Sequence, residues 1–179
     1  MFASDLHGSK GAAQQVVAQF HAEGAHRLIL LGDLLYHGPR NPLPDDYDPQ
    51  AVALLLNSIA EDIIAVRGNC DSEVDQMLLD FPIMSDSTSV LLENGCRFFV
   101  THGHIFNQSN MPKLKANDVF VQGHVHIPQV EKSDSIWLFN PGSPTFPREG
   151  HVPTLGWYDD GQLAIRTLSG EIVTQAVLF

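Results

Sequence analysis

The sequence predicts an α/β fold in which two β-sheets pack as a layered sandwich with helices. Two observations favour it. The first half of the chain alternates short apolar runs with helical stretches, and the second half is a series of short β-rich runs. The length of 179 residues and the apolar share of 44 % suit a single core, so residues 1–179 are expected to form one domain.

The first half predicts a parallel βαβαβ unit. Met1–Ser4 is typical of the end of a strand, and we expect the start of that strand to precede the sequence. A helix is expected from Lys10 to Glu23, followed by a buried strand at Leu28–Leu31. A second helix, Pro49–Ile59, begins with proline, which suits a first helical turn, and Ile63–Val66 is the next buried strand.

The second half predicts a mostly antiparallel sheet. Turn signals at Glu93-Asn94-Gly95 and Asp159-Asp160-Gly161 separate several of its strands. The expected strands are Ser89–Leu92, Arg97–Thr101, Val119–Gln122, Ile136–Asn140, Leu155–Tyr158, Leu163–Thr167 and Ile172–Leu178.

The composition disfavours several classes of partner. With 10 Lys+Arg against 21 Asp+Glu, the net charge of −11 disfavours sequence-independent nucleic-acid binding and docking to anionic lipid. Only Cys70 and Cys96 occur, which is no disulfide framework, so a reducing cytoplasm is expected. No apolar run reaches the ~18 residues of a membrane span.

Five blocks of polar residues follow apolar runs directly. In open α/β sheets, ligands bind beyond the carboxyl ends of the strands, so these blocks are expected to meet at one rim. The blocks are Asp5-Leu6-His7-Gly8, Gly32-Asp33, Gly68-Asn69-Cys70-Asp71, His102-Gly103-His104 and Gly123-His124-Val125-His126.

Each block also has a plain structural interpretation. Gly-Asp after a strand is usually a turn whose aspartate caps a helix, and Asn69 suits a turn with left-handed geometry. His102 or His104 alone could be an ordinary strand histidine. Gly-His-x-His is the most specific block, because residues i and i+2 of an extended segment point the same way. The plain interpretations do not explain why all five blocks follow strands.

The residue types favour a two-metal site. Imidazole and carboxylate without thiolate suit Mn, Fe, Zn or Ni, and seven ligands are too many for one ion with open positions. Two dications ~4 Å apart repel by roughly 17 kcal/mol at an effective dielectric near 20, so anions must lie between them. One aspartate and one hydroxide meet this need.

The order of the five blocks, Asp5 to His126, resembles that of the calcineurin-like metallophosphoesterase superfamily. The small size, Gly68-Asn69-Cys70-Asp71, the Tyr36–Asn41 loop and Asn140-Pro141-Gly142-Ser143 look most like the small bacterial YfcE-type phosphodiesterases. The resemblance implies a four-layer sandwich of two mixed β-sheets flanked by α-helices. It also implies in-line attack on phosphorus by a hydroxide that bridges two divalent ions, Mn²⁺ foremost, with Ni²⁺, Fe²⁺, Zn²⁺ or Mg²⁺ as alternatives.

The resemblance assigns roles to individual residues. Asp33 would bridge the two ions. The first ion would be held by Asp5, His7 and His126, and the second by Asn69, His102 and His124. Many relatives carry histidine after the motif's asparagine, where this chain has Cys70. A thiol is a weaker acid than imidazolium, so esters with a leaving group that needs little protonation are expected; an inert Cys70 is the alternative.

Further residues are expected around the metals. Asp71 is a catalytic candidate and, with Arg67, a brace for its loop. His37, Arg40 and Asn41 lie in a long Pro-rich loop, where they could contact the substrate phosphate or simply be solvated. His104 could approach the substrate without ligating a metal.

The sequence therefore predicts a two-metal phosphodiesterase acting on small esters. A phosphomonoesterase, nucleotide phosphatase or protein phosphatase could use the same metal residues, so the ligands do not separate these activities. A protein-interaction scaffold is a further alternative, although scaffolds tend to lose metal ligands and all seven are present. Several apolar segments that we expect to be exposed could form a subunit interface, so a homo-oligomer is also compatible with the sequence.

Overall fold

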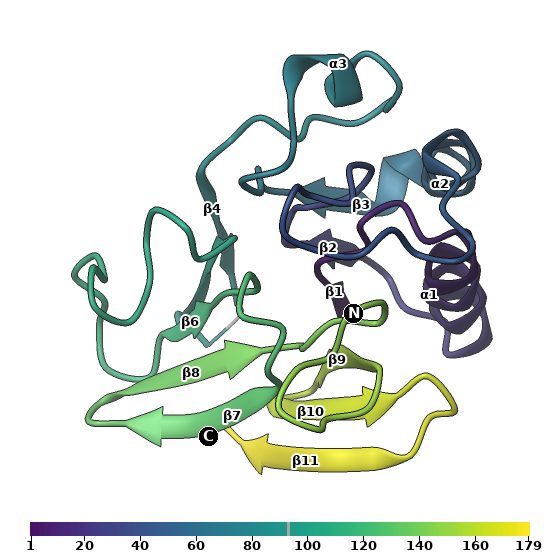
Figure 1. Ribbon diagram of the computed structural model, residues 1–179. Coiled ribbons are helices and arrows are strands. Elements are labelled where there is room, and N and C mark those ends of the chain that lie inside the picture. Colours follow the sequence, from purple (N-terminus) through teal and green to yellow (C-terminus); the bar gives the residue numbers. More distant parts are fainter. Residues whose placement is uncertain (93) are drawn as a thin grey trace.

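The computed structural model describes residues 1–92 and 94–179, so Glu93 of the expected 93–95 turn lies outside the described residues. Two β-sheets form the body of the molecule (Figure 1). One contains β1 (Phe2–Ala3), β2 (Leu28–Leu30), β3 (Ile63–Ala65), β9 (Thr154–Asp159), β10 (Gln162–Thr167) and β11 (Ile172–Val177). The other contains β4 (Ser87–Leu91), β5 (Arg97–Thr101), β6 (Val119–Val121), β7 (Gln129–Ser133) and β8 (Ile136–Asn140).

The helices lie mainly against one sheet. Helix α1 (Lys10–Ala22) begins where the Ser9 side chain accepts a hydrogen bond from the Ala12 N–H, and Asp48 caps α2 (Pro49–Asn57) through Ala51 in the same way. Both pack on the outer side of β1, β2 and β3 (Figure 1). A 3₁₀ turn, η1 (Ala60–Asp62), and the single-turn α3 (Glu73–Gln76) complete the set. No described helix is long and apolar enough to cross a membrane.

The strand order confirms two mixed sheets. The six-stranded sheet runs β11-β10-β9-β1-β2-β3, with β1, β2 and β3 parallel as expected and β9 antiparallel to β1. The five-stranded sheet runs β4-β5-β6-β8-β7. The expectation of a mostly antiparallel second half is wrong for β5, β6 and β8, which pair in parallel. Longer connections, from β5 to β6 and from β6 to β8, return the chain to the same end of the sheet before β6 and β8 begin, whereas β5 follows β4 after a short connection.

Strand β7 is absent from the sequence prediction. Its sequence QVEKS is largely polar, and most of its side chains reach solvent. It pairs with β8 at the edge of the sheet, where main-chain hydrogen bonds suffice and no apolar alternation is required.

Two apolar clusters hold the layers together. One joins α1 and α2 to the six-stranded sheet through residues such as Val16, Leu30 and Leu56. The other lies between the sheets, where Phe2 packs edge-on against Phe98 and Phe139 at ring-centroid distances of 5.5 and 5.1 Å. Because the strands of both sheets are anchored by these clusters, the loops at their ends are held at fixed positions.

The outer face of the five-stranded sheet is covered by irregular chain. Phe99 stacks on the buried Phe120, and Phe106, from the segment between β5 and β6, packs edge-on against Phe99. Among the described residues, the outermost layer on this side is therefore a packed loop.

Candidate metal centre

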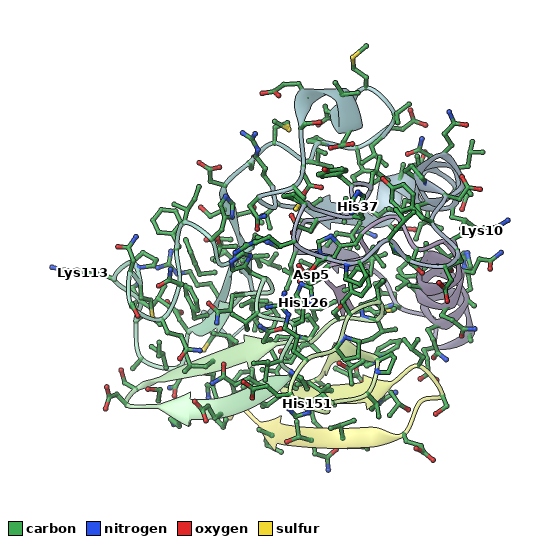
Figure 2. The ribbon with its side chains drawn as sticks, in the orientation of Figure 1. Asp5, Lys10, His37, Lys113, His126 and His151 are labelled. Atoms are coloured by element: carbon green, nitrogen blue, oxygen red, sulfur yellow. The ribbon has the colours of Figure 1, made fainter. Side chains whose placement is uncertain are left out.

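The five polar blocks meet at one rim, at the carboxyl ends of β1, β2, β3, β5 and β6. Figure 2 shows Asp5 and His126 close together in the middle of the molecule. Several of these residues have left-handed backbone geometry, with φ of 60° at Asp5, 55° at Asp33 and 66° at His124. Such geometry is unfavourable for side-chain-bearing residues and often marks functional sites.

Main-chain hydrogen bonds impose this geometry on the first two blocks. The Asp5 N–H donates to the Gly32 carbonyl at 3.0 Å, and the His7 N–H donates to the Asp33 carbonyl at 2.9 Å. The side chain of Asn140 donates to the Gly123 carbonyl at 2.9 Å, and Ser143 donates to the Asp5 carbonyl at 2.9 Å. The loops are thus tied to one another before any ligand binds.

One group of donor atoms consists of Asp5, His7 and His126. Asp5 Oδ1 lies 3.1 Å from His126 Nε2 and 3.6 Å from His7 Nε2, and all three side chains are buried. The Nδ1 atoms bind main-chain carbonyls, His7 at Tyr36 (3.0 Å) and His126 at Phe146 (2.7 Å). With Nδ1 protonated for these contacts, each Nε2 presents a lone pair to the group, as in metal-binding histidines.

A second group lies beside the first and includes Asp33, Asn69, His102 and His124. His102 Nε2 is 3.5 Å from Asp33 Oδ2, 3.1 Å from Asn69 Oδ1 and 3.2 Å from His124 Nδ1. The opposite ring nitrogen of His102 contacts the Leu31 carbonyl at 2.7 Å. Asp33 Oδ2 is also 3.7 Å from His7 Nε2, which places this carboxylate between the two groups.

The donor set fits divalent metal ions. Asp5 is fully buried, yet its Oδ1 has no hydrogen-bond partner among residues 1–92 and 94–179. A buried, unpartnered carboxylate oxygen is unfavourable unless a cation or a proton donor compensates it. Buried carboxylates surrounded by imidazoles, with Nε2 atoms free to coordinate, are the ligand chemistry of Mn, Fe, Zn and Ni sites.

Electrostatic coupling within the groups is strong. Burial lowers the pKa of His102, but the contact with Asp33 and the charges of Asp5 and Asp33 outweigh burial and raise that pKa to about 9. Burial raises the pKa of Asp33, but the contact with His102 and its charge hold that pKa below its usual range. In the metal-free protein, a proton on His102 therefore supplies part of the positive charge that these carboxylates require.

The Asp71 side chain holds together the loops that follow β2 and β3. Its carboxylate accepts hydrogen bonds from the N–H groups of Asp33 (2.8 Å), Leu34 (2.9 Å) and Gly68 (2.7 Å), while Arg67 Nε donates to the Asp71 carbonyl. Burial, followed by the charge of Asp33, raises the pKa of Asp71 to about 6. The geometry gives Asp71 a positioning role, with its carboxylate occupied by main-chain donors.

A small cavity, about 30 Å³ in volume, lies over the two groups of donor atoms. Cys70 is one of the residues that line it. Its N–H donates to Asp33 Oδ1 at 2.8 Å, and the Asn69 amide donates to its sulfur at 3.2 Å. Burial, then the charge of Asp33, raises the pKa of the thiol far above its usual value. A neutral thiol therefore lines the cavity next to Asp33.

The residues expected to contact substrate are not all in the cavity. Arg40 and Asn41 line it, and the Asn41 amide lies 3.4 Å from His7 Nε2. The ring of His37 packs against Tyr36 and Tyr47, at centroid distances of 4.7 and 5.5 Å, and His37 is not among the described residues that line the cavity. The position of His37 therefore supports a role in shaping the loop.

Three further residues lie around the site: His104, which was expected near the substrate, and Arg148 and Thr145, which the sequence did not indicate. His104 lies beside the second group, with its ring centroid 5.3 Å from that of His102. Arg148 also lines the cavity, although it follows no recognisable motif. The hydroxyl of Thr145 donates to the Leu6 carbonyl at 2.8 Å, which fixes the first block from the C-terminal half.

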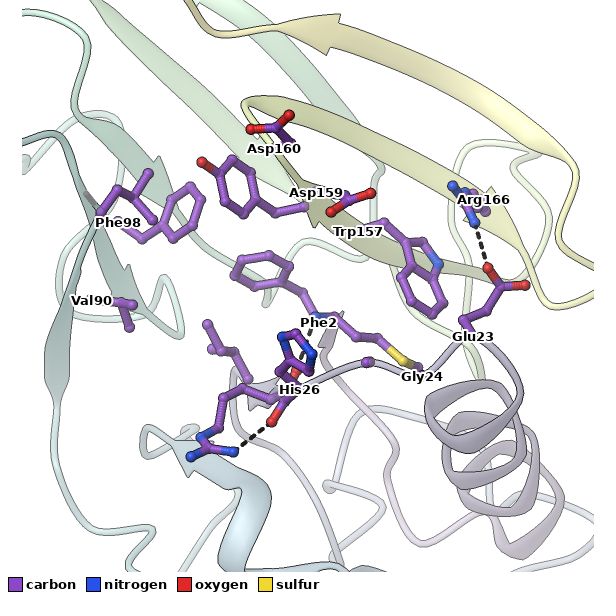
Figure 3. A pocket seen from close by; sticks show the side chains of 16 residues that line it. Phe2, Glu23, Gly24, His26, Val90, Phe98, Trp157, Asp159, Asp160 and Arg166 are labelled. Atoms are coloured by element: carbon purple, nitrogen blue, oxygen red, sulfur yellow. Dashed lines mark hydrogen bonds and ion pairs between the residues drawn. The ribbon is translucent and has the colours of Figure 1, made fainter. Parts of the chain in front are cut away.

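A separate cavity of about 400 Å³ lies at the other end of the strands, lined by residues such as Phe2, Gly24, Trp157 and Arg166 (Figure 3). This cavity is at the amino ends of β1 and β2, whereas the polar blocks follow the carboxyl ends of the same strands. Its lining includes the Arg166–Glu23 ion pair at 3.2 Å.

Comparison with known proteins places the chain in a family. Residues 1–159 match the calcineurin-like phosphoesterase superfamily domain. The chain is 49 % identical to "Phosphodiesterase YfcE" of Escherichia coli over 177 residues, covering 99 % of this chain and 96 % of that protein. A solved structure of the E. coli phosphoesterase Yfce superimposes with a TM-score of 0.98 at 48 % identity, covering 100 % of this chain and 98 % of that one.

A more distant likeness concerns the fold alone. Zinc-complexed Vps29 from Entamoeba histolytica superimposes with a TM-score of 0.58 at 15 % identity, covering 99 % of this chain and 98 % of that one. The match over residues 1–159 and the identity over nearly the full length show that the chain belongs to the calcineurin-like phosphoesterase superfamily.

Proposed function

We propose that this member of the calcineurin-like phosphoesterase superfamily is a phosphodiesterase that hydrolyses small phosphodiesters with two divalent metal ions. Asp5, His7 and His126 would hold one ion, and Asn69, His102 and His124 the other. The observation that carries the proposal is the position of Asp33, whose Oδ2 lies 3.7 Å from His7 Nε2 and 3.5 Å from His102 Nε2. A carboxylate between two sets of ligands is the arrangement that two ions require. Mn²⁺ is the first candidate, with Ni²⁺, Fe²⁺, Zn²⁺ or Mg²⁺ as alternatives.

The metals and the chain would divide the chemistry. Bound divalent ions supply Lewis acidity that activates water near neutral pH and offsets charge on phosphoryl oxygens. Arg40 and Arg148 line the cavity and can fork onto phosphate oxygens, while Asn41 offers an amide beside His7. Asp71 keeps the Asp33 and Gly68 loops together through its three main-chain hydrogen bonds.

Two observations favour a diester over a monoester substrate. The relative that is 49 % identical over nearly the whole chain is named a phosphodiesterase. A second hollow, about 770 Å³ in volume, adjoins the site at His124 and could hold a second ester substituent. A phosphomonoesterase or nucleotide phosphatase using the same residues remains the alternative.

The test compares a diester with a monoester across metals. Metal-stripped protein is reloaded with Mn²⁺, Ni²⁺, Mg²⁺ or Zn²⁺ and assayed on bis(p-nitrophenyl) phosphate and p-nitrophenyl phosphate. We expect kcat/KM to favour the diester by at least about tenfold. Asp33→Asn should lower kcat/KM by on the order of 10³-fold, because loss of one well-placed electrostatic group costs several kcal/mol at the transition state.

Asp159→Asn is the matched control, since Asp159 lines the separate cavity at the other end of the strands and should leave activity unchanged. Full activity in the stripped protein or in Asp33→Asn would refute the two-metal proposal. A preference for the monoester would instead favour the phosphatase alternative.

A further inference from the structure

The hollow beside His124 is a groove with two walls. One wall is formed by residues of the 103–109 segment, and the other by residues 122–129. Its volume of about 770 Å³ lies within the ~300–1,000 Å³ that small-molecule sites usually have. His124 lines both this groove and the cavity over the candidate metal ligands, so the two spaces adjoin. A diester with its phosphorus at the metals could place one substituent in the groove.

Gln122 lies in the groove with an unsatisfied side chain. It follows β6, where Val119 and Val121 face the core between the sheets and the alternate positions, Phe120 and Gln122, face the other way. Gln122 is only 5 % exposed, yet its Oε1 has no hydrogen-bond partner in the described chain. Its main-chain N–H donates to the Phe139 carbonyl at 2.9 Å, which fixes the residue in place.

A buried acceptor without a donor lowers the stability of a folded protein. Gln122 lines the groove, but its Oε1 atom is covered in the unliganded protein, so a ligand group that donates a hydrogen bond to Oε1 requires a rotation of the carboxamide toward the groove. The adjacent amide nitrogen can donate in return, so the carboxamide recognises a donor next to an acceptor.

The remaining lining shows what kind of group would fit. Val125, Ile127 and Pro128 supply apolar surface, whereas Asn107, Gln108 and Ser109 supply neutral polar groups. Among the described residues that line the groove, none is Asp, Glu, Lys or Arg. The groove therefore suits an uncharged group with apolar surface and a polar edge, and not a second phosphate.

We propose that the groove binds the nucleobase of a nucleoside phosphodiester, and that the Gln122 amide recognises an amino-bearing base edge such as that of adenine. Glutamine pairs with adenine through two hydrogen bonds, accepting from the exocyclic amine and donating to the neighbouring ring nitrogen. This inference rests on the proposed phosphodiesterase function, because it concerns one substituent of that substrate.

The test removes the amine from the substrate. Mn²⁺-loaded enzyme is assayed on the p-nitrophenyl esters of adenosine monophosphate and of purine riboside monophosphate, which lacks the exocyclic amine. The wild type should prefer the adenosine ester by about tenfold in kcat/KM, mainly through KM, which corresponds to ~1.4 kcal/mol. In Gln122→Met the preference should fall to about one, whereas Gln162→Met, an exposed glutamine on β10, should keep it.

Thermal stability separates recognition from a structural role. Gln122→Met removes a buried, unpartnered acceptor, so its Tm should be higher than that of the wild type. A lower Tm together with an unchanged preference would show a structural glutamine and overturn the inference. Equal use of the two esters by an active wild type would also overturn it, while the phosphodiesterase function would stand.

If the enzyme hydrolyses none of these esters or bis(p-nitrophenyl) phosphate, the proposed function fails and the groove is judged by binding. Calorimetry then compares adenosine monophosphate with purine riboside monophosphate. A Kd about tenfold lower for the adenosine compound, lost in Gln122→Met, supports the groove proposal, and equal affinities refute it.

Discussion

The two ends of strands β1, β2 and β3 differ in how their polar groups are satisfied. At the amino ends, around the cavity of about 400 Å³ in Figure 3, charged side chains pair near the surface, with Arg27–Asp62 at 2.6 Å and Arg166–Glu23 at 3.2 Å. At the carboxyl ends, the cavity over the candidate ligands is only about 30 Å³, but carboxylates and imidazoles are buried together. Asp5 Oδ1 has no hydrogen-bond partner there among the described residues, although two imidazoles lie within 4 Å of it.

The cavity directly over the candidate ligands is smaller than the amino-end cavity, although the groove of about 770 Å³ adjoins it at His124, so buried polar groups mark the candidate site better than the volume of one cavity does. Exposed ion pairs such as Arg27–Asp62 contribute about 0–1 kcal/mol each and need no ligand. Buried carboxylates in left-handed backbone are unfavourable until a cation compensates them. At the amino end only Arg166 Nε, among the described residues that line the cavity, is buried without a hydrogen-bond partner, whereas the carboxyl end buries whole carboxylates that require metal or protons.

The stability of the metal-free protein should reveal this requirement most strongly. The pKa of His102 is raised from 6.5 to about 9, so its stabilising contribution is fully present below pH 6.5 and is lost as pH rises through 9. The free energy of unfolding should fall by up to about 3 kcal/mol over this window, at ~1.4 kcal/mol per pKa unit. Denaturant unfolding at several pH values measures it.

His102→Gln should abolish most of this dependence, whereas His151→Gln, a change at an exposed residue, should retain it. Saturation with Mn²⁺ should weaken the dependence, because metal binding requires neutral imidazole. The same pH slope in wild type and His102→Gln would refute the coupling.

A pair of glycine substitutions compares the two ends directly. A Cβ atom on Gly68 would collide with the main-chain nitrogen and Oδ1 of Asp33, whereas one on Gly24, in the amino-end cavity, meets nothing within 4 Å. Gly68→Ala should cost roughly 1–3 kcal/mol of stability and most of the activity, because Asp33 must move. Gly24→Ala, at a φ of +63°, should cost about 1 kcal/mol from backbone strain and leave kcat unchanged. Chemical denaturation and kcat measurements decide this, and equal losses of activity would contradict the difference between the ends.

The substitution expected to change activity least is Cys70→His. It tests whether residue 70 protonates the leaving group. The neutral thiol beside Asp33 is a poor proton donor, so the wild type should favour esters with acidic leaving groups. Cys70→His should raise the rate for an alkyl leaving group at least about tenfold more than for an aryl one, a modest share of general-acid catalysis. Cys96→His, outside the rim, is the control. If both substrates change by the same factor, Cys70 has no role in leaving-group chemistry.

Much of the fold could be predicted because burial leaves a pattern in the sequence. The apolar runs at Leu28–Leu30 and Ile63–Ala65 give strands within a residue of those expected, and Pro49 begins its helix as expected. The polar edge strand β7 leaves no such pattern, because its pairing with β8 depends on main-chain atoms. The parallel sense of β5, β6 and β8 also depends on the path of the connections, which residue types do not specify.

The residues of the candidate site could likewise be predicted only where a local sequence pattern indicates them. Short motifs located the metal-binding candidates because ligand spacing is local, as in Gly123-His124-Val125-His126. The contacts of Arg148, Thr145 and Gln122 depend on segments far apart in the chain, so no local pattern could indicate them. His37, adjacent to Tyr36, was expected at the substrate but packs against aromatic rings.

The central claim is that the carboxyl-end rim holds two metal ions with Asp33 between them. Equilibrium dialysis of the metal-free protein against Mn²⁺ tests it most directly, with bound metal counted per chain in wild type, Asp33→Asn and Asp159→Asn. We predict two tightly bound ions in the wild type and in Asp159→Asn, and loss of at least one in Asp33→Asn. A single ion in the wild type, or two retained with unchanged affinity in Asp33→Asn, would contradict the claim.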